Sequence, residues 1–182
     1  MSDTRKVKNL LLTGRPGVGK TTVVQAVVRL FPGEVGGFLT GEIRERGTRK
    51  GFSITSVEGE RTVMAHVDFR SSGRVGKYGV DVPAFERIAL LALRDAIQRK
   101  RIIVIDEIGK MELASQKFCE AVREALSSGK FVVATIMQHR HPFADEIKEL
   151  PCVEVIEITV QNRDGVPGKI REMLALGGAT KA

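Results

Sequence analysis

The chain has 182 residues, with 29 Lys and Arg against 22 Asp and Glu, which gives a formal charge of +7 at pH 7. Its 42% hydrophobic and 28% charged residues exclude both a disordered chain and a membrane protein. No apolar run approaches the roughly 20 residues that cross a bilayer, and the acidic start at Asp3 lacks the apolar region of a secretory signal. We therefore predict one cytoplasmic, monomeric domain over residues 1–182 that binds an anionic partner.

The cysteine and histidine content predicts neither a disulfide framework nor a zinc site. Cys119 and Cys152 are the two cysteines of the chain, and we expect both to be buried thiols. His139 and His141 flank an arginine without a nearby carboxylate pattern, so a loop is expected there rather than a metal site.

The first elements predict a strand, a glycine loop and a helix. An apolar run at 7–13 ends at a glycine, as buried parallel strands do. The loop at 14–21 leads into a helical apolar pattern at 22–31, which stops before Pro32.

The next segment has a different pattern, which predicts an inserted antiparallel meander over about residues 36–82. Short β-prone runs occur at 37–40, 52–57 and 61–67. Residues 68–82 follow with three glycines and no periodicity, which predicts a long surface loop and a candidate lid.

The second half of the chain predicts alternating helices and strands. Helices are expected at 84–100, 115–126, 144–150 and 162–176, and strands at 101–107, 131–136 and 153–158. This alternation predicts an α/β fold with a mostly parallel central sheet flanked by helices. We expect Asn162 or Asp164 to cap the last helix and residues 177–182 to form a flexible tail.

A phosphate-binding motif lies between the first predicted strand and helix. The motif G-x-x-x-x-G-K-[ST] is matched by Gly14, Arg15, Pro16, Gly17, Val18, Gly19, Lys20 and Thr21. Its backbone N–H groups can surround a polyphosphate, Lys20 can contact the β- and γ-phosphates, and the Thr21 hydroxyl can hold Mg²⁺. With Thr22, these residues form the predicted nucleotide-binding loop.

Two acids end the apolar strand at 101–107. The carboxyl ends of parallel strands face the ligand crevice of such a sheet, so both side chains are expected near the bound phosphates. Asp106 is then the predicted Mg²⁺ ligand, and Glu107 is placed to activate water for attack on the γ-phosphorus. The predicted nucleotide site is completed by Ile105, Asp106, Glu107, Ile108 and Gly109.

Arginines could stabilise the transition state of phosphoryl transfer. We favour Arg70 and Arg74 in the glycine-rich loop as fingers, with Arg15 and Arg140 as further candidates. Solvated surface arginines are an equally good interpretation of each of them.

Recognition of the γ-phosphate and of the base is less visible. Thr135 and Gln138, at the end of the next strand, are candidates for a γ-phosphate sensor, although they fit a simple strand-end turn equally well. No Asn-Lys-x-Asp sequence is present to recognise guanine, so we expect broad use of ATP, GTP, CTP and UTP or TTP.

The motifs together resemble the THEP1-type nucleoside-triphosphatases. The resemblance is carried by the glycine loop, by residues 37–40 with 51–52, by residues 75–82, by residues 106–112, by residues 141–143 and by residues 162–164. It implies a RecA-like P-loop fold and magnesium-dependent hydrolysis of several nucleoside triphosphates to diphosphate and phosphate.

Two alternatives remain open. A P-loop kinase would transfer the γ-phosphoryl group to a small molecule or a nucleic-acid end, with residues 68–82 as the acceptor lid. A nucleic-acid-associated ATPase would use the basic charge, for which Arg44, Arg46, Arg49 and Lys50 around the meander are the remaining candidates. This alternative is not favoured, because 5% aromatic residues, with one Tyr and no Trp, provide few side chains on which bases could stack.

Overall fold

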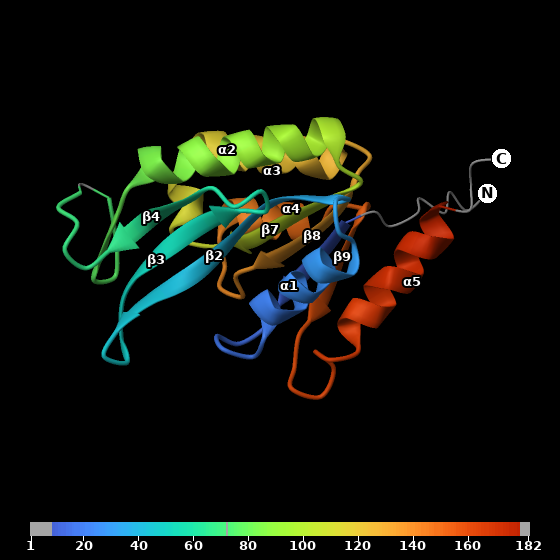
Figure 1. Cartoon of the computed structure of the whole chain (residues 1–182), viewed down its shortest axis with the longest axis horizontal. Coiled ribbons are helices and arrows are strands. Elements are labelled where there is room, and N and C mark those ends of the chain that lie inside the picture. Colours follow the sequence, from blue (N-terminus) through green and yellow to red (C-terminus); the bar gives the residue numbers. More distant parts are fainter. Residues whose placement is uncertain (1–8, 72, 179–182) are drawn as a thin grey trace.

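One nine-stranded sheet organises the part of the chain that the computed structural model describes, residues 9–71 and 73–178 (Figure 1). The strands are β1 (Asn9–Thr13), β2 (Val35–Glu45), β3 (Thr48–Ser56), β4 (Arg61–His66), β5 (Arg74–Val75), β6 (Tyr78–Val80), β7 (Ile102–Ile108), β8 (Phe131–Ile136) and β9 (Val153–Glu157). The helices are α1 (Lys20–Leu30), α2 (Val82–Arg99), α3 (Gln116–Ser127), α4 (Pro142–Lys148) and α5 (Val166–Gly178), with a 3-10 turn η1 (Glu112–Ala114).

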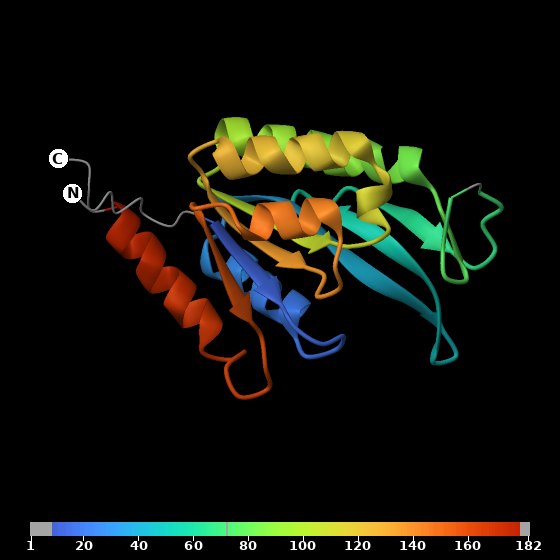
Figure 2. The same cartoon turned by 180° about the vertical axis from the view of Figure 1, so that it is seen from behind.

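Half of the sheet is parallel, as the continuous apolar runs predict. β2, β7, β8, β1 and β9 pair in that order, all in parallel. Helices α2, α3 and α4 cover one face, and α1 and α5 cover the other (Figures 1 and 2). The carboxyl ends of β1 and β7 therefore lie at the same edge of the sheet, separated by β8. The predicted α/β fold is confirmed.

The meander continues this sheet on one side. β2 pairs in parallel with β7 over Val35–Leu39 and then in antiparallel with β3, so one strand belongs to both halves. Gly37 allows the close approach to β7: it has a φ of +110°, and an added Cβ would collide with the carbonyl oxygen of Val104. The strand prediction at 37–40 is thus correct in place but too short.

The expected loop at 68–82 contains a small hairpin. β5 and β6 pair in antiparallel, and β6 pairs with β4 at the outer edge of the sheet. The absence of periodicity was misleading here because two- and three-residue strands are too short to display an alternating pattern.

The start of the last helix differs from the prediction. α5 begins at Val166, so neither Asn162 nor Asp164 lies directly before it. The Asn162 side chain instead donates to the carbonyl oxygen of Glu157 at 2.8 Å and accepts from the N–H of Thr159 at 2.9 Å. These bonds order the loop between β9 and α5.

The two ends of the chain are described only in part. α5 continues to Gly178, past the expected start of the tail, and residues 179–182 and 7–8 lie outside the described residues. Cys119 is buried as expected, whereas Cys152 is only half-buried. Within the described ranges, no helix is long and apolar enough to cross a membrane.

Candidate active site

The glycine loop joins β1 to α1, in the predicted place. α1 begins at Lys20, two residues earlier than expected. Gly14 has a φ of +144°, and an added Cβ would lie 2.6 Å from the Ile158 carbonyl oxygen, so this position needs glycine. The Lys20 ammonium donates to the carbonyl oxygens of Gly14 at 2.8 Å and Arg15 at 3.2 Å. It thus lies on the loop that is expected to surround the phosphates.

Asp106 lies under this loop. Its side chain is buried, and Oδ1 accepts a hydrogen bond from the Thr135 hydroxyl at 2.6 Å. Burial raises the pKa of Asp106, while the hydroxyls of Thr135 and Thr21 and the Lys20 ammonium oppose this rise. The structure therefore brings Thr21, Lys20 and Asp106 together from two elements that are about 85 residues apart.

The other carboxylate oxygen of Asp106 is without a partner. Oδ2 is buried and makes no hydrogen bond within the described residues. A buried carboxylate oxygen is costly unless it is paired, and oxygen ligands suit Mg²⁺. The Asp106 oxygen and the Thr21 hydroxyl, which faces it, are therefore a donor set that fits the predicted metal ion. No cluster of three or more His, Cys, Asp or Glu side chains suited to a metal occurs in the described ranges, so the ion would depend on Asp106 and Thr21.

Glu107 occupies the next position on β7, where the sheet is irregular. Pairing with β8 is interrupted between Ile105 and Ile108, and the peptide bond between Asp106 and Glu107 is cis. Burial and the neighbouring Asp106 raise the pKa of Glu107, and the Lys20 ammonium lowers it. The Glu107 carboxylate is thus close to the cation of the glycine loop.

Two predicted nucleotide ligands are core residues instead. The side chains of Ile105 and Ile108 are fully buried, and both belong to the cluster beneath α2 and α3. Their side chains pack in the core and hold the end of β7 in place. Their apolar character was a signal of this role in the sequence.

The two candidates for a γ-phosphate sensor, Thr135 and Gln138, differ in their surroundings. The Thr135 hydroxyl is fully buried and donates to Asp106, so it orients this carboxylate. Gln138 is exposed on the loop after β8.

A third carboxylate was not recognised in the sequence. Glu112, in η1, is buried, and the side chain lies beside Glu107: a Cβ added to Gly109 would collide with Glu107 Oε1 and lie 2.9 Å from Glu112 Oε2. Burial and the nearby Glu107 raise the pKa of Glu112 to about 8. The only sequence signal was its place at the end of the 106–112 string.

The favoured arginine fingers are not close to the glycine loop. The Arg74 guanidinium donates to the carbonyl oxygens of Lys77 at 2.6 Å and Phe69 at 3.5 Å, within its own loop. Arg74 lies on β5, and seven strand intervals separate β5 from β1 in the sheet, roughly 34 Å at about 4.8 Å each. Arg70 is exposed on the same loop. The expectation that this loop covers the phosphates is therefore not met in this structure.

A different arginine contacts the glycine loop. Arg163, between β9 and α5, donates to the Val18 carbonyl oxygen at 3.2 Å, and its Cδ lies 3.1 Å from the place of a Cβ at Gly19. Of the other two candidates, Arg15 is exposed on the loop itself, and Arg140 is exposed after β8. Sequence reasoning missed Arg163 because its contact spans 145 positions along the chain.

Comparison with known proteins identifies the family of this chain. Residues 9–171 match the family described as NTPase. Nucleoside-triphosphatase THEP1 of Thermotoga sp. (strain RQ2) is 44% identical over 172 residues, which cover 94% of this chain and 98% of that protein. THEP1 of Methanosarcina acetivorans is 43% identical over 88% of this chain and 93% of that protein. The chain belongs to the THEP1 nucleoside-triphosphatase family.

Two solved structures of related proteins share its fold. The crystal structure of THEP1 from Aquifex aeolicus has a TM-score of 0.81 and 41% identity, and it covers 89% of this chain and 96% of that one. The solution structure of a human cancer-related nucleoside triphosphatase has a TM-score of 0.78 and 36% identity, over 96% of this chain and all of that one. The resemblance stated from the sequence motifs is thus confirmed.

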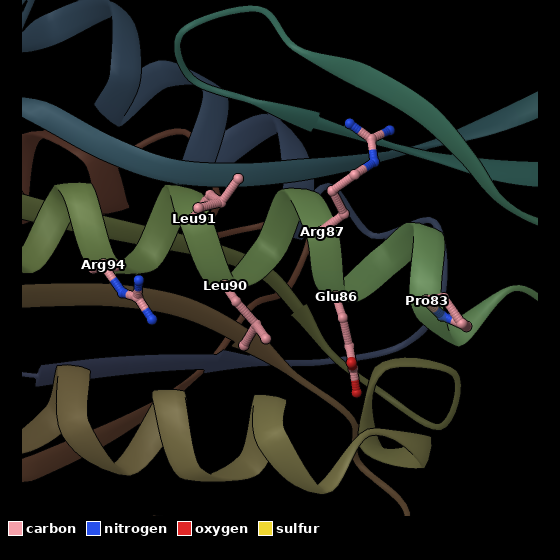
Figure 3. A pocket seen from close by; sticks show the side chains of 6 residues that line it. All are labelled: Pro83, Glu86, Arg87, Leu90, Leu91 and Arg94. Atoms are coloured by element: carbon pink, nitrogen blue, oxygen red, sulfur yellow. The ribbon is translucent and has the colours of Figure 1, made fainter.

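Other surface features lie apart from the THEP1-type site. A shallow hollow on the outer side of α2 contains none of the residues discussed above, and Leu91 in it is 54% exposed. It is lined by Pro83, Glu86, Arg87, Leu90, Leu91 and Arg94 (Figure 3). α2 covers the face of the sheet opposite α1, which carries Lys20 and Thr21 (Figure 1).

The basic cluster around the meander is partly neutralised. Arg44 and Arg49 both pair with Glu42, at 2.6 Å and 2.7 Å. The Arg49 guanidinium also donates to the Tyr78 hydroxyl at 3.0 Å. Two of the four basic side chains are thus engaged within the protein, which weakens the case for a nucleic-acid surface there.

Proposed function

We propose that the protein hydrolyses nucleoside triphosphates to diphosphate and phosphate, with Glu107 as the base that activates water. The observation that supports this most directly is a second carboxylate directly after Asp106, close to the Lys20 ammonium of the glycine loop. A carboxylate in this position can accept a proton from water, and membership of the THEP1 family points to the same reaction.

The proposed reaction assigns a separate task to each side chain. The backbone N–H groups of the glycine loop bind the phosphates, and Lys20 exchanges the carbonyl oxygens of Gly14 and Arg15 for phosphate oxygens. Glu107 takes the proton of the attacking water as its oxygen bonds to the γ-phosphorus. The bond from the γ-phosphorus to the bridging oxygen breaks, and the diphosphate leaves with that electron pair.

Magnesium completes the proposed site. Thr21 and Asp106 would hold the ion, with Thr135 fixing the orientation of the Asp106 carboxylate. When bound, the ion supplies positive charge to the phosphate oxygens. Oδ1 of Asp106 is engaged by Thr135, and Oδ2 is buried without a hydrogen-bond partner in the described chain.

We further propose that the protein is a monomer and that it hydrolyses nucleoside triphosphates with several different bases. The phosphate and metal contacts come from the glycine loop and from β7, and neither depends on the identity of the base. Arg163 lies on the glycine loop, and a guanidinium can stack on any base because every base has a π-face.

The test measures phosphate release from ATP, GTP, CTP and UTP with Mg²⁺ and no added acceptor. We expect release from all four by the wild type. The Glu107→Gln variant should lose about 10²- to 10⁴-fold in kcat and keep its nucleotide affinity, because an amide cannot accept the proton. Glu149→Gln, which removes an exposed carboxylate at the end of α4, is the matched control and should be fully active.

Two outcomes would contradict the proposal. Turnover that persists in Glu107→Gln would remove Glu107 as the base. Phosphate release that requires an added hydroxyl acceptor would show transfer rather than hydrolysis and would favour a kinase.

A further inference from the structure

Glu112 is a buried carboxyl group that the proposed reaction does not use. Its side chain is 5% exposed, and no basic side chain in the described part of the chain lowers its pKa. A buried carboxylate without a cation is strongly disfavoured, so the group takes up a proton. Its pKa of about 8 makes it neutral at pH 7.

The turn after β7 directs this side chain to Glu107. The N–H of Leu113 donates to the Gly109 carbonyl oxygen at 2.9 Å, which reverses the chain so that η1 begins at Glu112. The absence of a side chain at Gly109 leaves a space that Glu107 Oε1 and Glu112 Oε2 both border. The backbone N–H groups of Gly109 and Glu112 face the Glu112 carboxyl group, so they occupy acceptor sites on it and leave its O–H free to donate.

We propose that Glu112 is a positioning residue, whose neutral carboxylic acid donates a hydrogen bond to Glu107 and holds that carboxylate in the orientation that activates water. This inference rests on the proposed role of Glu107. It adds a residue that touches neither substrate nor metal but that fixes one oxygen of the base and leaves the other for water.

The donated bond separates this role from a purely structural one. As an acceptor for the two backbone N–H groups, Glu112 would serve equally well when ionised. As a donor to Glu107, it serves only when protonated. The charged groups around the pair are Asp106 and Glu107 on β7 and Lys20 on α1, and they are the same in every variant at position 112.

The test compares Glu112→Gln and Glu112→Met with the wild type in magnesium-dependent phosphate release. Glutamine keeps an N–H donor of similar shape, so its kcat at pH 7 should remain within about threefold of the wild type. Methionine keeps the volume but donates nothing, so its kcat should fall about 10- to 100-fold with little change in KM. The ratio of the Gln variant's rate to the wild-type rate should rise above pH 8, where Glu112 ionises.

Controls distinguish this inference from its premise. Glu86, on α2, accepts a hydrogen bond from the hydroxyl of Ser115, which lies between η1 and α3. Glu86→Gln therefore weakens the attachment of the same turn without changing a group that faces Glu107. It should leave kcat unchanged, and thermal melting should show that all variants are folded. If Glu107→Gln is fully active, the proposed function has failed. If Glu107→Gln is inactive while Glu112→Met keeps the wild-type kcat, only this inference is wrong. An equal loss of kcat in the Gln and Met variants would also overturn it.

Discussion

The buried carboxyl group at Glu112 predicts a pH dependence of folding stability. In the folded protein its pKa is about 8, whereas the unfolded chain has the ordinary value of 4.5. Between these values the folded state holds a proton that the unfolded chain releases. The free energy of unfolding therefore falls as the pH rises. The contribution of the Glu112 proton is fully present below about pH 4.5 and is lost above about pH 8.

The slope of this change can be worked out from the shift. One proton bound in the folded state alone lowers the free energy of unfolding by about 1.4 kcal/mol for each pH unit. Between pH 5 and pH 8 the loss is on the order of 4 kcal/mol, which is a large part of the stability of an ordinary domain. Glu112→Gln has no proton to release, so its stability relative to the wild type should rise by this amount across the same interval.

Urea unfolding at a series of pH values from 5 to 9 measures the effect. Groups other than Glu112 titrate in both proteins, so the difference in the free energy of unfolding isolates position 112 and its coupling to Glu107. Glu86→Gln is the matched control: the hydroxyl of Ser115 and the ammonium of Lys117 lower the pKa of Glu86, so it is ionised in both states over this range. If the difference in the free energy of unfolding between Glu112→Gln and the wild type stays constant from pH 5 to pH 9, the assignment of a neutral carboxyl group to Glu112 is refuted.

Two further predictions concern side chains that the structure places differently from the sequence. Thr135→Val removes the hydroxyl that holds Asp106 in a buried site, so the Mg²⁺ concentration for half-maximal phosphate release should rise about 10- to 100-fold; an unchanged metal requirement would contradict this orienting role. Arg74→Ala removes only contacts within its own loop, so kcat should stay within about a factor of two. A large loss of kcat with unchanged nucleotide affinity would restore the arginine-finger interpretation of Arg74.

The parts of the fold that local sequence determines were predictable. The glycine loop was identified because glycine, lysine and threonine must follow one another at fixed spacing between a strand and a helix. The buried strands β7 and β8 were identified because they are covered by helices on both faces and so are continuously apolar. The side chains of Asp106 and Glu107 then followed from their place at the carboxyl end of β7.

The parts that depend on distant pairing were not predictable in the same way. Apolar periodicity shows that Ile105 is buried but not that Thr135 meets Asp106, because that contact depends on the register between β7 and β8. The hydrogen bond from Arg163 to the glycine loop similarly depends on how the segment after β9 packs against β1. A charged side chain looks the same in sequence whether it is solvated or bound to a distant backbone carbonyl.

Three carboxyl groups at the end of β7 illustrate how environment assigns function. Asp106 is oriented by a hydroxyl and faces the Thr21 hydroxyl and Lys20, which suits a metal ligand. Burial and the neighbouring Asp106 raise the pKa of Glu107, which increases its affinity for a proton, and the Lys20 ammonium opposes this rise. No basic side chain among the described residues lowers the pKa of Glu112, which stays neutral at pH 7. A triphosphate brings several negative charges to this place, and each ionised carboxylate repels them. Because Glu112 is protonated, only Asp106 and Glu107 repel the triphosphate, and these are the two acids whose charge the proposed reaction needs. The Glu112 O–H still orders the Glu107 carboxylate.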